Sequence, residues 1–320
     1  MTLAANTDPV EVSVLVPAKD EAENLTEFIA QCAAALEPQP FACEVVVIDD
    51  GSADGTANLL QDLRREYRFL RVVTHRTGRG IADALKSGSE AARGHIFVFY
   101  PADLQFLPAE IPSLVEPIIS GEVDMVTGTK QGQYEKAFVS GIYNRMCRWL
   151  FGVKVTDLNA VKAYRREVME VVPTRPDWHR FMVPLAAADG FRLTERPVTL
   201  HPRLHGQSKF GMGRIPVGML DLLSVWFQLR FGRKPLMFFG VPGGLLILLG
   251  FLVGVVAIGL RLGGAGFRPL LSLTLILVIS GIALFGFGFI GELLAGQREE
   301  LRSLSRSVER LSSDRSHLDS

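Results

Sequence analysis

The sequence has little of several features that would narrow its function at once. Its 320 residues carry no excess charge, with 34 Lys and Arg against 34 Asp and Glu, so composition gives no reason to expect a nucleic acid as partner. Only three cysteines occur, Cys32, Cys43 and Cys147, and none forms a CxxC pair. This excludes a disulfide framework and a zinc site of the usual spacing, and it predicts small core residues in a reducing compartment. Residues 1–9 lack a basic stretch followed by an apolar core, so we expect no signal peptide.

Charge is also missing from two long segments near the C-terminus. Residues 236–260 and 270–291 have no charged side chain, and each is at least as long as the roughly 20 apolar residues that cross a bilayer. The segment between them is short, which predicts a hairpin of two transmembrane helices. Basic residues are more frequent on the outer sides of this pair than in its loop, which favours both termini in the cytoplasm.

The segments on either side of the hairpin carry different patterns. Residues 212–235 form an apolar-rich stretch with Trp226 and Phe227 and basic residues at its end, typical of a juxtamembrane helix that lies in the membrane interface. A core helix of the soluble part is the alternative reading. Residues 297–320 are charged and predict a helical cytoplasmic tail.

In residues 1–211, short β-branched runs alternate four times with segments of helical periodicity. The predicted strands cover residues 10–16, 44–48, 70–74 and 97–100, and the predicted helices cover 25–36, 53–67, 81–92 and 108–120. Such alternation predicts an α/β fold with a doubly wound, mainly parallel sheet that is covered on both faces.

Polar residues follow each of these strands: Glu21, Asp50, residues 78–80 and Asp103. Because the carboxyl ends of parallel strands share one edge of the sheet, we expect these residues to converge on one ligand. Asp103 and Gln105 follow the fourth strand and offer oxygen ligands, which a hard divalent cation prefers. A cation there would clamp a diphosphate. At this point, an ordinary proline-containing turn stays open as the alternative.

The turn after the second strand has its own chemistry. Gly51 permits a tight change of direction. We assign Asp50 to a ribose or a base, whose donors a carboxylate can accept, and Asp54 to the cap of the following helix.

Three motifs in this order resemble those of family 2 glycosyltransferases: Pro17-Ala18-Lys19-Asp20-Glu21, Asp49-Asp50-Gly51-Ser52 and Ala102-Asp103-Leu104-Gln105. With the basic loop that contains Arg203 and Gly206-Gln207-Ser208-Lys209-Phe210, the chain more narrowly resembles polyprenyl-phosphate sugar transferases of the dolichyl-phosphate mannose synthase type. The resemblance covers residues 10–211. It implies a GT-A-like cytoplasmic domain over residues 1–211, ahead of the membrane hairpin.

The resemblance also implies roles for individual residues. The nucleotide's base and ribose would be held by Pro17, Ala18, Glu21 and Asp50. Mg²⁺ or Mn²⁺ on the diphosphate would be carried by Asp103 and Gln105. The donor and acceptor phosphates would be surrounded by Lys130, Arg203, Ser208 and Lys209. Lys130 stands where relatives often have arginine, and it attracts phosphate as a point charge without a bidentate fork.

Two departures from the family pattern bear on activity. Relatives usually have aspartate where this chain has Pro101, and proline cannot bind a metal, so we expect weaker cation binding or an inactive site. The segment 157–162 lacks a Gly-Phe pair that relatives often show, which bears on recognition of the acceptor or the sugar.

The implied reaction is inverting transfer of one sugar from a nucleotide-diphosphate sugar to a polyprenyl or dolichyl phosphate at the cytoplasmic membrane face. The lipid phosphate is already an anion at pH 7, so positioning and charge neutralisation would dominate catalysis. Asp103, Lys130, Arg203 and Lys209 are the candidate catalytic residues, and Asp157 stays open as a base or a positioning acid.

Two other functions remain open at this stage. A non-catalytic membrane protein that retains the nucleotide-sugar-binding fold is suggested by Pro101. A polysaccharide synthase would need a larger bundle of spans than one hairpin. The sequence also leaves a homo-oligomer open.

Overall fold

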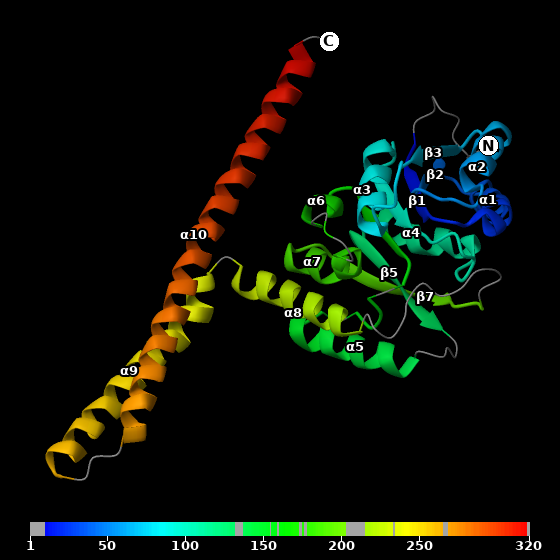
Figure 1. Cartoon of the computed structure of the whole chain (residues 1–320). Coiled ribbons are helices and arrows are strands. Elements are labelled where there is room, and N and C mark those ends of the chain that lie inside the picture. Colours follow the sequence, from blue (N-terminus) through cyan, green and yellow to red (C-terminus); the bar gives the residue numbers. More distant parts are fainter. Residues whose placement is uncertain are drawn as a thin grey trace. The chain divides into compact units, whose positions relative to one another are not determined.

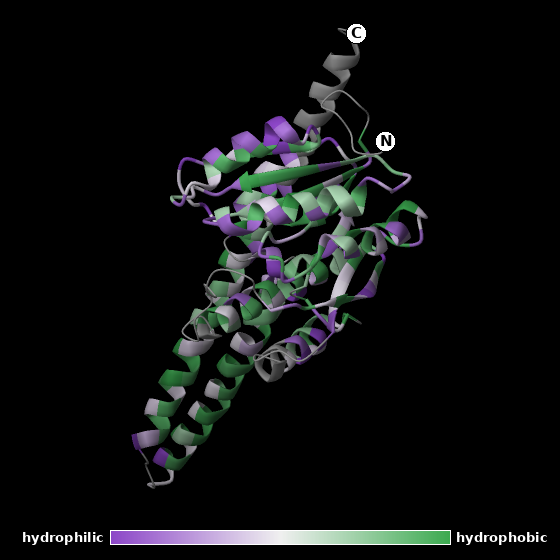
Figure 2. Ribbon diagram, turned by 90° about the vertical axis from the view of Figure 1, so that its right-hand side faces the viewer, coloured by the Kyte–Doolittle hydropathy of each residue, from purple (hydrophilic) through white to green (hydrophobic). Residues whose placement is uncertain are grey.

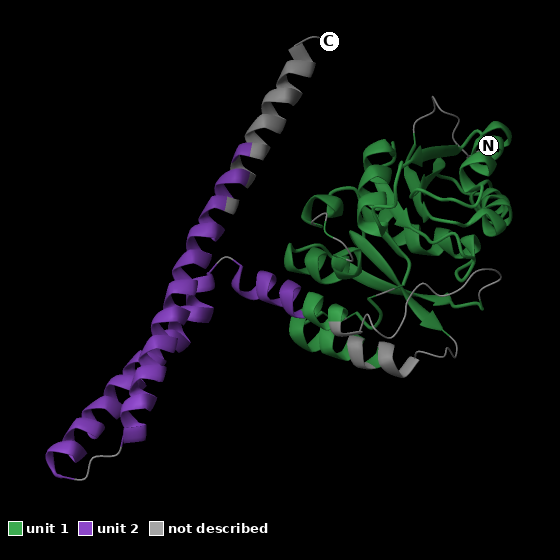
Figure 3. Cartoon of the chain, in the orientation of Figure 1, with its two compact units in different colours: residues 1–222 green, residues 223–320 purple. Residues whose placement is uncertain are grey.

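The structure is a computed structural model. It describes residues 10–131, 137–153, 155–158, 160–172, 175, 178–202, 215–232, 234–264 and 268–318. The chain divides into two compact units, residues 1–222 and 223–320 (Figure 3). The division falls within a helix, C-terminal to the predicted boundary at residue 211.

The first unit is built on one seven-stranded sheet. Its strands are β1 (Val12–Ala18), β2 (Cys43–Asp49), β3 (Leu70–Thr74), β4 (Ile96–Phe99), β5 (Met125–Gln131), β6 (Lys162–Arg165) and β7 (Leu193–Thr199). Their order across the sheet is β3-β2-β1-β4-β6-β5-β7. Figure 1 labels β1, β2, β3, β5 and β7. Only β6 runs against the others, since it pairs antiparallel with both β4 and β5. The predicted α/β fold with a mainly parallel sheet is confirmed.

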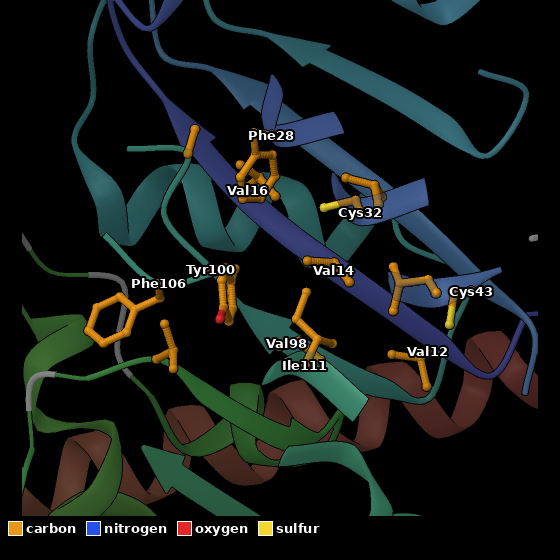
Figure 4. Packing of buried hydrophobic residues seen from close by; sticks show 14 of the residues in the cluster. Val12, Val14, Val16, Phe28, Cys32, Cys43, Val98, Tyr100, Phe106 and Ile111 are labelled. Carbon is orange, nitrogen blue, oxygen red and sulfur yellow. The ribbon is translucent and has the colours of Figure 1, made fainter. Parts of the chain in front are cut away.

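Helices connect the strands. They are α1 (Ala22–Leu36), α2 (Thr56–Glu66), α3 (Ile81–Ala91), α4 (Ile111–Ile119), α5 (Ala137–Phe151), α6 (Val168–Val171) and α7 (Met182–Ala188), with 3₁₀ turns η1 (Pro108–Glu110) and η2 (Trp178–Phe181). Successive side chains of a strand point to opposite sides of the sheet, so both faces carry apolar side chains, and helices cover both faces. From β1, Val14 and Val16 join the core that includes Phe28 of α1, whereas Leu15 meets Gly88 of α3 (Figure 4).

The core on the α1 side lies over β1, β2 and β4 (Figure 4). All seven residues of β2 are buried, as expected for a central strand of a parallel sheet. Phe28 and Tyr100 are fully buried, and their ring centroids lie 6.4 Å apart. Burial of a side chain as large as Phe28 contributes roughly 1.5–3 kcal/mol. This core holds the strand ends in fixed positions.

A buried carboxylate joins the amino ends of the central strands. Glu44, at the start of β2, is fully buried and accepts hydrogen bonds from Ser13 Oγ (2.7 Å), Arg93 N (2.6 Å) and Arg93 Nε (3.0 Å). Arg71 Nη1 adds an ion pair at 3.7 Å. A buried charge is tolerated only with such partners. This network lies at the edge of the sheet opposite to the predicted ligand residues.

The C-terminal helices are α8 (Ile215–Phe231), α9 (Pro235–Leu262) and α10 (Arg268–Leu318). By length and composition, α9 and residues 268–301 of α10 are helices that could cross a membrane. Large apolar side chains along both helices are exposed, and Figure 2 shows hydrophobic residues along both helices of the pair. The sequence predicts a span and a separate tail helix, but α10 is continuous, because residues 292–297 contain no proline to end it.

The two long helices meet through glycine. A Cβ atom added to Gly243 would lie 2.8 Å from the carbonyl oxygen of Gly281, and one added to Gly281 would lie 2.7 Å from that of Gly243. The two backbones are therefore in direct contact, which is typical of helix pairs in membranes. At the open end of the hairpin, Glu292 Oε2 accepts a hydrogen bond from Leu236 N (3.2 Å), one of the unpaired N–H groups of the first turn of α9.

Candidate functional site

The carboxyl edge of the sheet gathers most of the predicted residues. The strands β3, β2, β1, β4, β5 and β7 all end there, and the antiparallel β6 begins there. In spatial order, this edge carries residues 75–80, Asp50, Glu21, Asp103, Lys162, Lys130 and His201. Glu21, Asp50 and Asp103 therefore follow three adjacent strands at one edge, as the sequence predicts.

The loops after β1 and β2 are joined by hydrogen bonds. Asp20 N donates to Ser52 Oγ (2.9 Å), and Ala53 N donates to Asp20 Oδ1 (2.8 Å). Asp20 has a positive φ of 53°, which non-glycine residues rarely adopt. The side chain of Asp20 thus fixes one loop against the other, so the two motifs form one rigid segment.

Asp54 lies one residue before Gly55, the N-cap of α2, and its carboxylate binds the first N–H group of each helix that follows the two loops. Its carboxylate accepts hydrogen bonds from Thr56 N (3.1 Å), the first residue of α2, and from Ala22 N (3.1 Å), the first residue of α1. Burial would raise the pKa of Asp54, but the hydrogen bonds from Thr56 and Ala22 outweigh it and lower the pKa. The bond to Ala22 also explains why α1 begins at Ala22 and not at the predicted residue 25.

Asp50, directly after β2, is 6% exposed and is held by three donors. Asp50 Oδ1 lies 2.8 Å from His75 Nδ1 and accepts from Arg79 N at 2.8 Å, while Oδ2 accepts from Gly80 N at 2.8 Å. Burial would raise the pKa of Asp50, but these hydrogen bonds and the charge of His75 hold it below its usual range. The carboxylate is therefore anionic and fixed in orientation.

The other predicted nucleotide residues lie beside it. Pro17 and Ala18 are the last two residues of β1, and Ala18 O accepts a hydrogen bond from Asp50 N (2.8 Å). Glu21 is partly buried, and its Oε2 accepts from Asn24 Nδ2 (2.8 Å). The structure thus brings Pro17, Ala18, Glu21 and Asp50 together at the ends of β1 and β2.

The turn after β4 leaves Asp103 and Gln105 partly exposed. Burial alternates from residue 100 to residue 108, so that Ala102, Leu104 and Phe106 enter the core while the residues between them remain partly exposed. Leu104 has a positive φ of 55°, so this turn is locally strained. Pro101 is also partly exposed in this segment, and its side chain has no oxygen to offer a cation.

The segment after β7 pairs with this turn. His201 N donates to Gln105 O (2.8 Å), and Gln105 Nε2 lies 3.5 Å from His201 O. The described chain therefore runs beside Gln105 directly before the basic loop. Three predicted phosphate ligands, Arg203, Ser208 and Lys209, lie outside the described residues.

Lys130, near the end of β5, faces a carboxylate. Its Nζ lies 3.5 Å from Asp157 Oδ2, and the side chains are 14% and 6% exposed. The backbone oxygen of Asp157 accepts from Thr127 Oγ1 (3.2 Å), which fixes the segment before β6 against β5. Lys130 is thus at the predicted edge, and Asp157 is its ion-pair partner.

Sequence reasoning assigned no role to Lys162, the first residue of β6. Its side chain is buried, donates to Ala160 O (2.7 Å), and lies 5.9 Å from the centroid of the Phe99 ring. Burial and, to a smaller extent, the charge of Lys130 lower the pKa of Lys162 to about 7, against the opposing attraction of Asp157. The signal in the sequence is a single lysine within an apolar run.

His75 was also missed. It is 6% exposed, and its ring joins Asp50 to Ser87 of α3, with His75 Nε2 lying 3.0 Å from Ser87 Oγ. Sequence reasoning named only the glycine-containing part of this loop, residues 78–80, because a lone histidine after a strand carries no spacing pattern.

Comparisons with known proteins agree with this geometry. The family model described as Glycosyl transferase family 2 matches residues 13–168. Dodecaprenyl-phosphate galacturonate synthase of Rhizobium johnstonii is 32% identical over 305 residues, covering 90% of this chain and 89% of that protein. Undecaprenyl-phosphate 4-deoxy-4-formamido-L-arabinose transferase of Pseudomonas fluorescens is 30% identical over 305 residues, covering 92% of this chain and 87% of that protein.

A solved structure shares the fold at lower similarity. Glucosyl-3-phosphoglycerate synthase of Mycobacterium tuberculosis, solved with Mn²⁺, uridine diphosphate and glucosyl-3-phosphoglycerate, superposes with a TM-score of 0.53. The match has 20% identity and covers 68% of this chain and 80% of that chain. This supports the GT-A arrangement of the sheet. The matching family model and the two relatives, which align over about nine tenths of the chain, confirm the predicted resemblance, and the chain belongs to glycosyl transferase family 2.

Proposed function

We propose that this glycosyltransferase moves one sugar from a nucleotide-diphosphate sugar to the phosphate of a polyprenyl lipid, with inversion at the anomeric carbon. The observation that carries the proposal is the extent of the match: two proteins named for polyprenyl-phosphate sugar transfer align over at least 90% of this chain. The alignments include the apolar helices as well as the sheet. An enzyme with a water-soluble acceptor would not need helices that could cross a membrane, whereas an enzyme with a lipid acceptor would.

The donor's nucleoside would bind at the ends of β1 and β2. Asp50 is anionic and held in one orientation, so it can accept a hydrogen bond from an N–H of the base or an O–H of the ribose. Glu21 would contribute a second acceptor from the neighbouring strand end. Pre-organised acceptors of this kind favour binding because little ordering remains to be done.

Asp103 and Gln105 fit a divalent cation. A carboxylate oxygen and an amide oxygen are hard ligands, and Mg²⁺ is often bound through one or two carboxylates together with substrate phosphates. Both side chains are partly exposed in the same turn, at the carboxyl end of β4. Among the described residues, no group of three His, Cys, Asp or Glu side chains stands ready to hold a metal. A cation bound by Asp103 and Gln105 would neutralise charge on the departing diphosphate.

The phosphates would meet the basic side chains on the other half of the edge. Lys130 pairs with Asp157 at 3.5 Å, which holds its ammonium group at the end of β5. Arg203, Ser208 and Lys209 follow His201, whose backbone pairs with Gln105. These groups would bind the donor and acceptor phosphates and align the acceptor oxygen with the anomeric carbon. Because that oxygen is anionic at pH 7, orientation and charge neutralisation supply the catalysis and Asp157 acts as a positioning acid.

Membrane attachment would come from α9 and residues 268–301 of α10, with α8 in the interface. In α8, Val217, Leu220 and Leu223 are at least half exposed, as an interfacial helix requires. Basic residues on both outer sides of the hairpin support a cytoplasmic catalytic domain and cytoplasmic termini.

A non-catalytic role is not favoured. Pro101 removes one candidate carboxylate, but Asp103, Gln105 and the joined loops at the ends of β1 and β2 are retained, and the relatives are named as a synthase and a transferase. A reduced affinity for the cation is the consequence that we expect from Pro101.

The test is a thermal-shift panel of nucleotide sugars, with and without Mn²⁺, on the full chain in detergent. A donor that binds raises the apparent melting temperature. Asp103→Ala should abolish the part of this stabilisation that depends on Mn²⁺. Asp62→Ala, which removes an exposed carboxylate of α2 paired with Arg65, should leave it intact.

Product formation is measured in the same preparation. Labelled nucleotide sugar, polyprenyl phosphate and Mn²⁺ should yield a lipid that carries one sugar. No lipid-linked label with any donor, in a protein that binds donors, would refute the proposed transfer, and a polymeric product would indicate a polysaccharide synthase.

A further inference from the structure

The loop after β3 folds against the end of β2 with almost no free space. Gly51 has a positive φ of 71°, and a Cβ atom there would lie 2.7 Å from both Gly78 N and Thr77 C. A Cβ atom on Gly78 would lie 3.2 Å from Asp50 O. The two loops are therefore in backbone contact, and a small displacement of one displaces the other.

The polar link across this contact is His75. Its Nδ1 lies 2.8 Å from Asp50 Oδ1, its Nε2 lies 3.0 Å from Ser87 Oγ, and its backbone N donates to Asp49 O (2.9 Å). An ionised carboxylate only accepts hydrogen bonds, so Nδ1 carries a proton. The ring therefore connects the end of β2 to the body of α3 through a directed hydrogen bond.

The order serine, histidine, aspartate is also that of hydrolytic triads, but this arrangement does not suit nucleophilic catalysis. Ser87 lies within α3, where backbone N–H groups are used in helical hydrogen bonds. Such groups are not available to stabilise an oxyanion near Ser87. The chain of contacts is suited to holding Asp50.

The contacts also limit what Asp50 can do. A carboxylate has about four lone-pair sites. Among the described contacts, Oδ1 accepts from His75 and Arg79 N, and Oδ2 accepts from Gly80 N. This leaves room for about one further donor, on Oδ2. A small rotation of the carboxylate would spoil that single contact.

We propose that His75 is a positioning residue for the donor: it fixes the Asp50 carboxylate and the loop of residues 78–80 so that Oδ2 is presented to the nucleoside. This inference rests on the proposed function, since it requires a nucleotide sugar as donor. His75 touches neither the sugar nor the lipid. Its loss should therefore weaken donor binding while the chemical step and lipid binding are retained.

The test compares three substitutions in the full chain in detergent. His75→Leu removes both ring contacts. His75→Asn presents an amide N–H near the position of Nδ1, and His75→Gln presents one near the position of Nε2. Loss of a hydrogen bond to a charged group is expected to raise the donor Kd roughly tenfold to a hundredfold in His75→Leu.

The pattern among variants separates positioning from a general loss of structure. We expect His75→Asn to bind the donor within about threefold of wild type, and His75→Gln to resemble His75→Leu. In each weak variant, KM for the donor should rise while kcat and KM for polyprenyl phosphate stay near wild type. The same Kd in the Asn and Gln variants, or a fall in kcat that matches the rise in KM, would overturn the inference. The Asn and Gln comparison decides it even where His75→Leu does not fold.

Failure of the inference is distinguishable from failure of the proposed function. Wild-type protein that binds no nucleotide sugar would overturn both. Wild-type protein that binds a donor, together with His75→Leu that binds it equally well, would overturn the positioning role alone. Ser87→Ala removes only the contact between Ser87 Oγ and His75 Nε2 and leaves the one between His75 and Asp50. It should therefore raise the donor Kd less than His75→Leu does.

Discussion

The ammonium group of Lys162 should make the stability of the protein depend on pH in a way that one substitution removes. Burial lowers its pKa from 10.5 to about 7 in the folded chain. The unfolded chain therefore binds a proton between pH 7 and 10.5 that the native chain has lost. The free energy of unfolding therefore rises with pH in this window. Below pH 7, Lys162 is protonated in both states and adds no pH dependence.

The magnitude follows from the same two values. One pKa unit corresponds to about 1.4 kcal/mol, so the charged form costs the native state on the order of 5 kcal/mol relative to the neutral form. Lys162→Met keeps an unbranched side chain, one atom shorter than that of lysine, and removes the charge. Between pH 6.5 and pH 9.5, the free energy of unfolding of wild type should gain about 3 kcal/mol relative to that of Lys162→Met.

The assay is urea unfolding of the full chain in detergent at a series of pH values, followed by tryptophan fluorescence. Taking the difference between variants cancels the titrating groups that do not interact with Lys162. Lys86→Met is the matched control, because the Lys86 side chain is 53% exposed on α3, and its curve should run parallel to that of wild type. Parallel curves for wild type and Lys162→Met would refute the account of Lys162.

Two further predictions concern the loops after β2 and β3, which are in backbone contact, and the buried thiols. Gly51 and Gly55 both have a left-handed backbone, with φ of 71° and 94°, so replacing either by alanine strains the backbone by about 1–2 kcal/mol. Only at Gly51 does the new Cβ also clash with another backbone segment, 2.7 Å from Gly78 N. Gly51→Ala should therefore lower the melting temperature more than Gly55→Ala and should also weaken donor binding, and equal effects would contradict the backbone contact. Burial, with a smaller effect of nearby charge, raises the pKa of the Cys43 thiol to about 12 and that of the Cys32 thiol further. At pH 8, iodoacetamide should therefore label neither cysteine in the folded protein and both in urea, which mass spectrometry would measure.

The sequence was sufficient for the order of strands and helices in the first half of the chain. Short β-branched runs differ clearly from helical periodicity, and each run ends at a polar residue. Because parallel strands share an edge, the meeting of Glu21, Asp50 and Asp103 follows from that order without any distance information.

Other features depend on contacts between distant residues, which no local pattern carries. Lys162 acquires its environment from Phe99 and Asp157, and His75 acquires its role from Asp50 and Ser87. The start of α1 was misplaced because its first N–H is satisfied by a carboxylate more than thirty residues away. The antiparallel β6 was not predicted, since a four-residue strand has too few positions to show a period.

The unbroken length of α10 has a mechanical consequence. At a rise of about 1.5 Å per residue, a helix of 51 residues is a rod of about 77 Å, of which residues 270–291 are the uncharged apolar part (Figure 1). Because no proline interrupts this helix, a tilt of its proposed membrane-spanning part would swing the polar end through an arc.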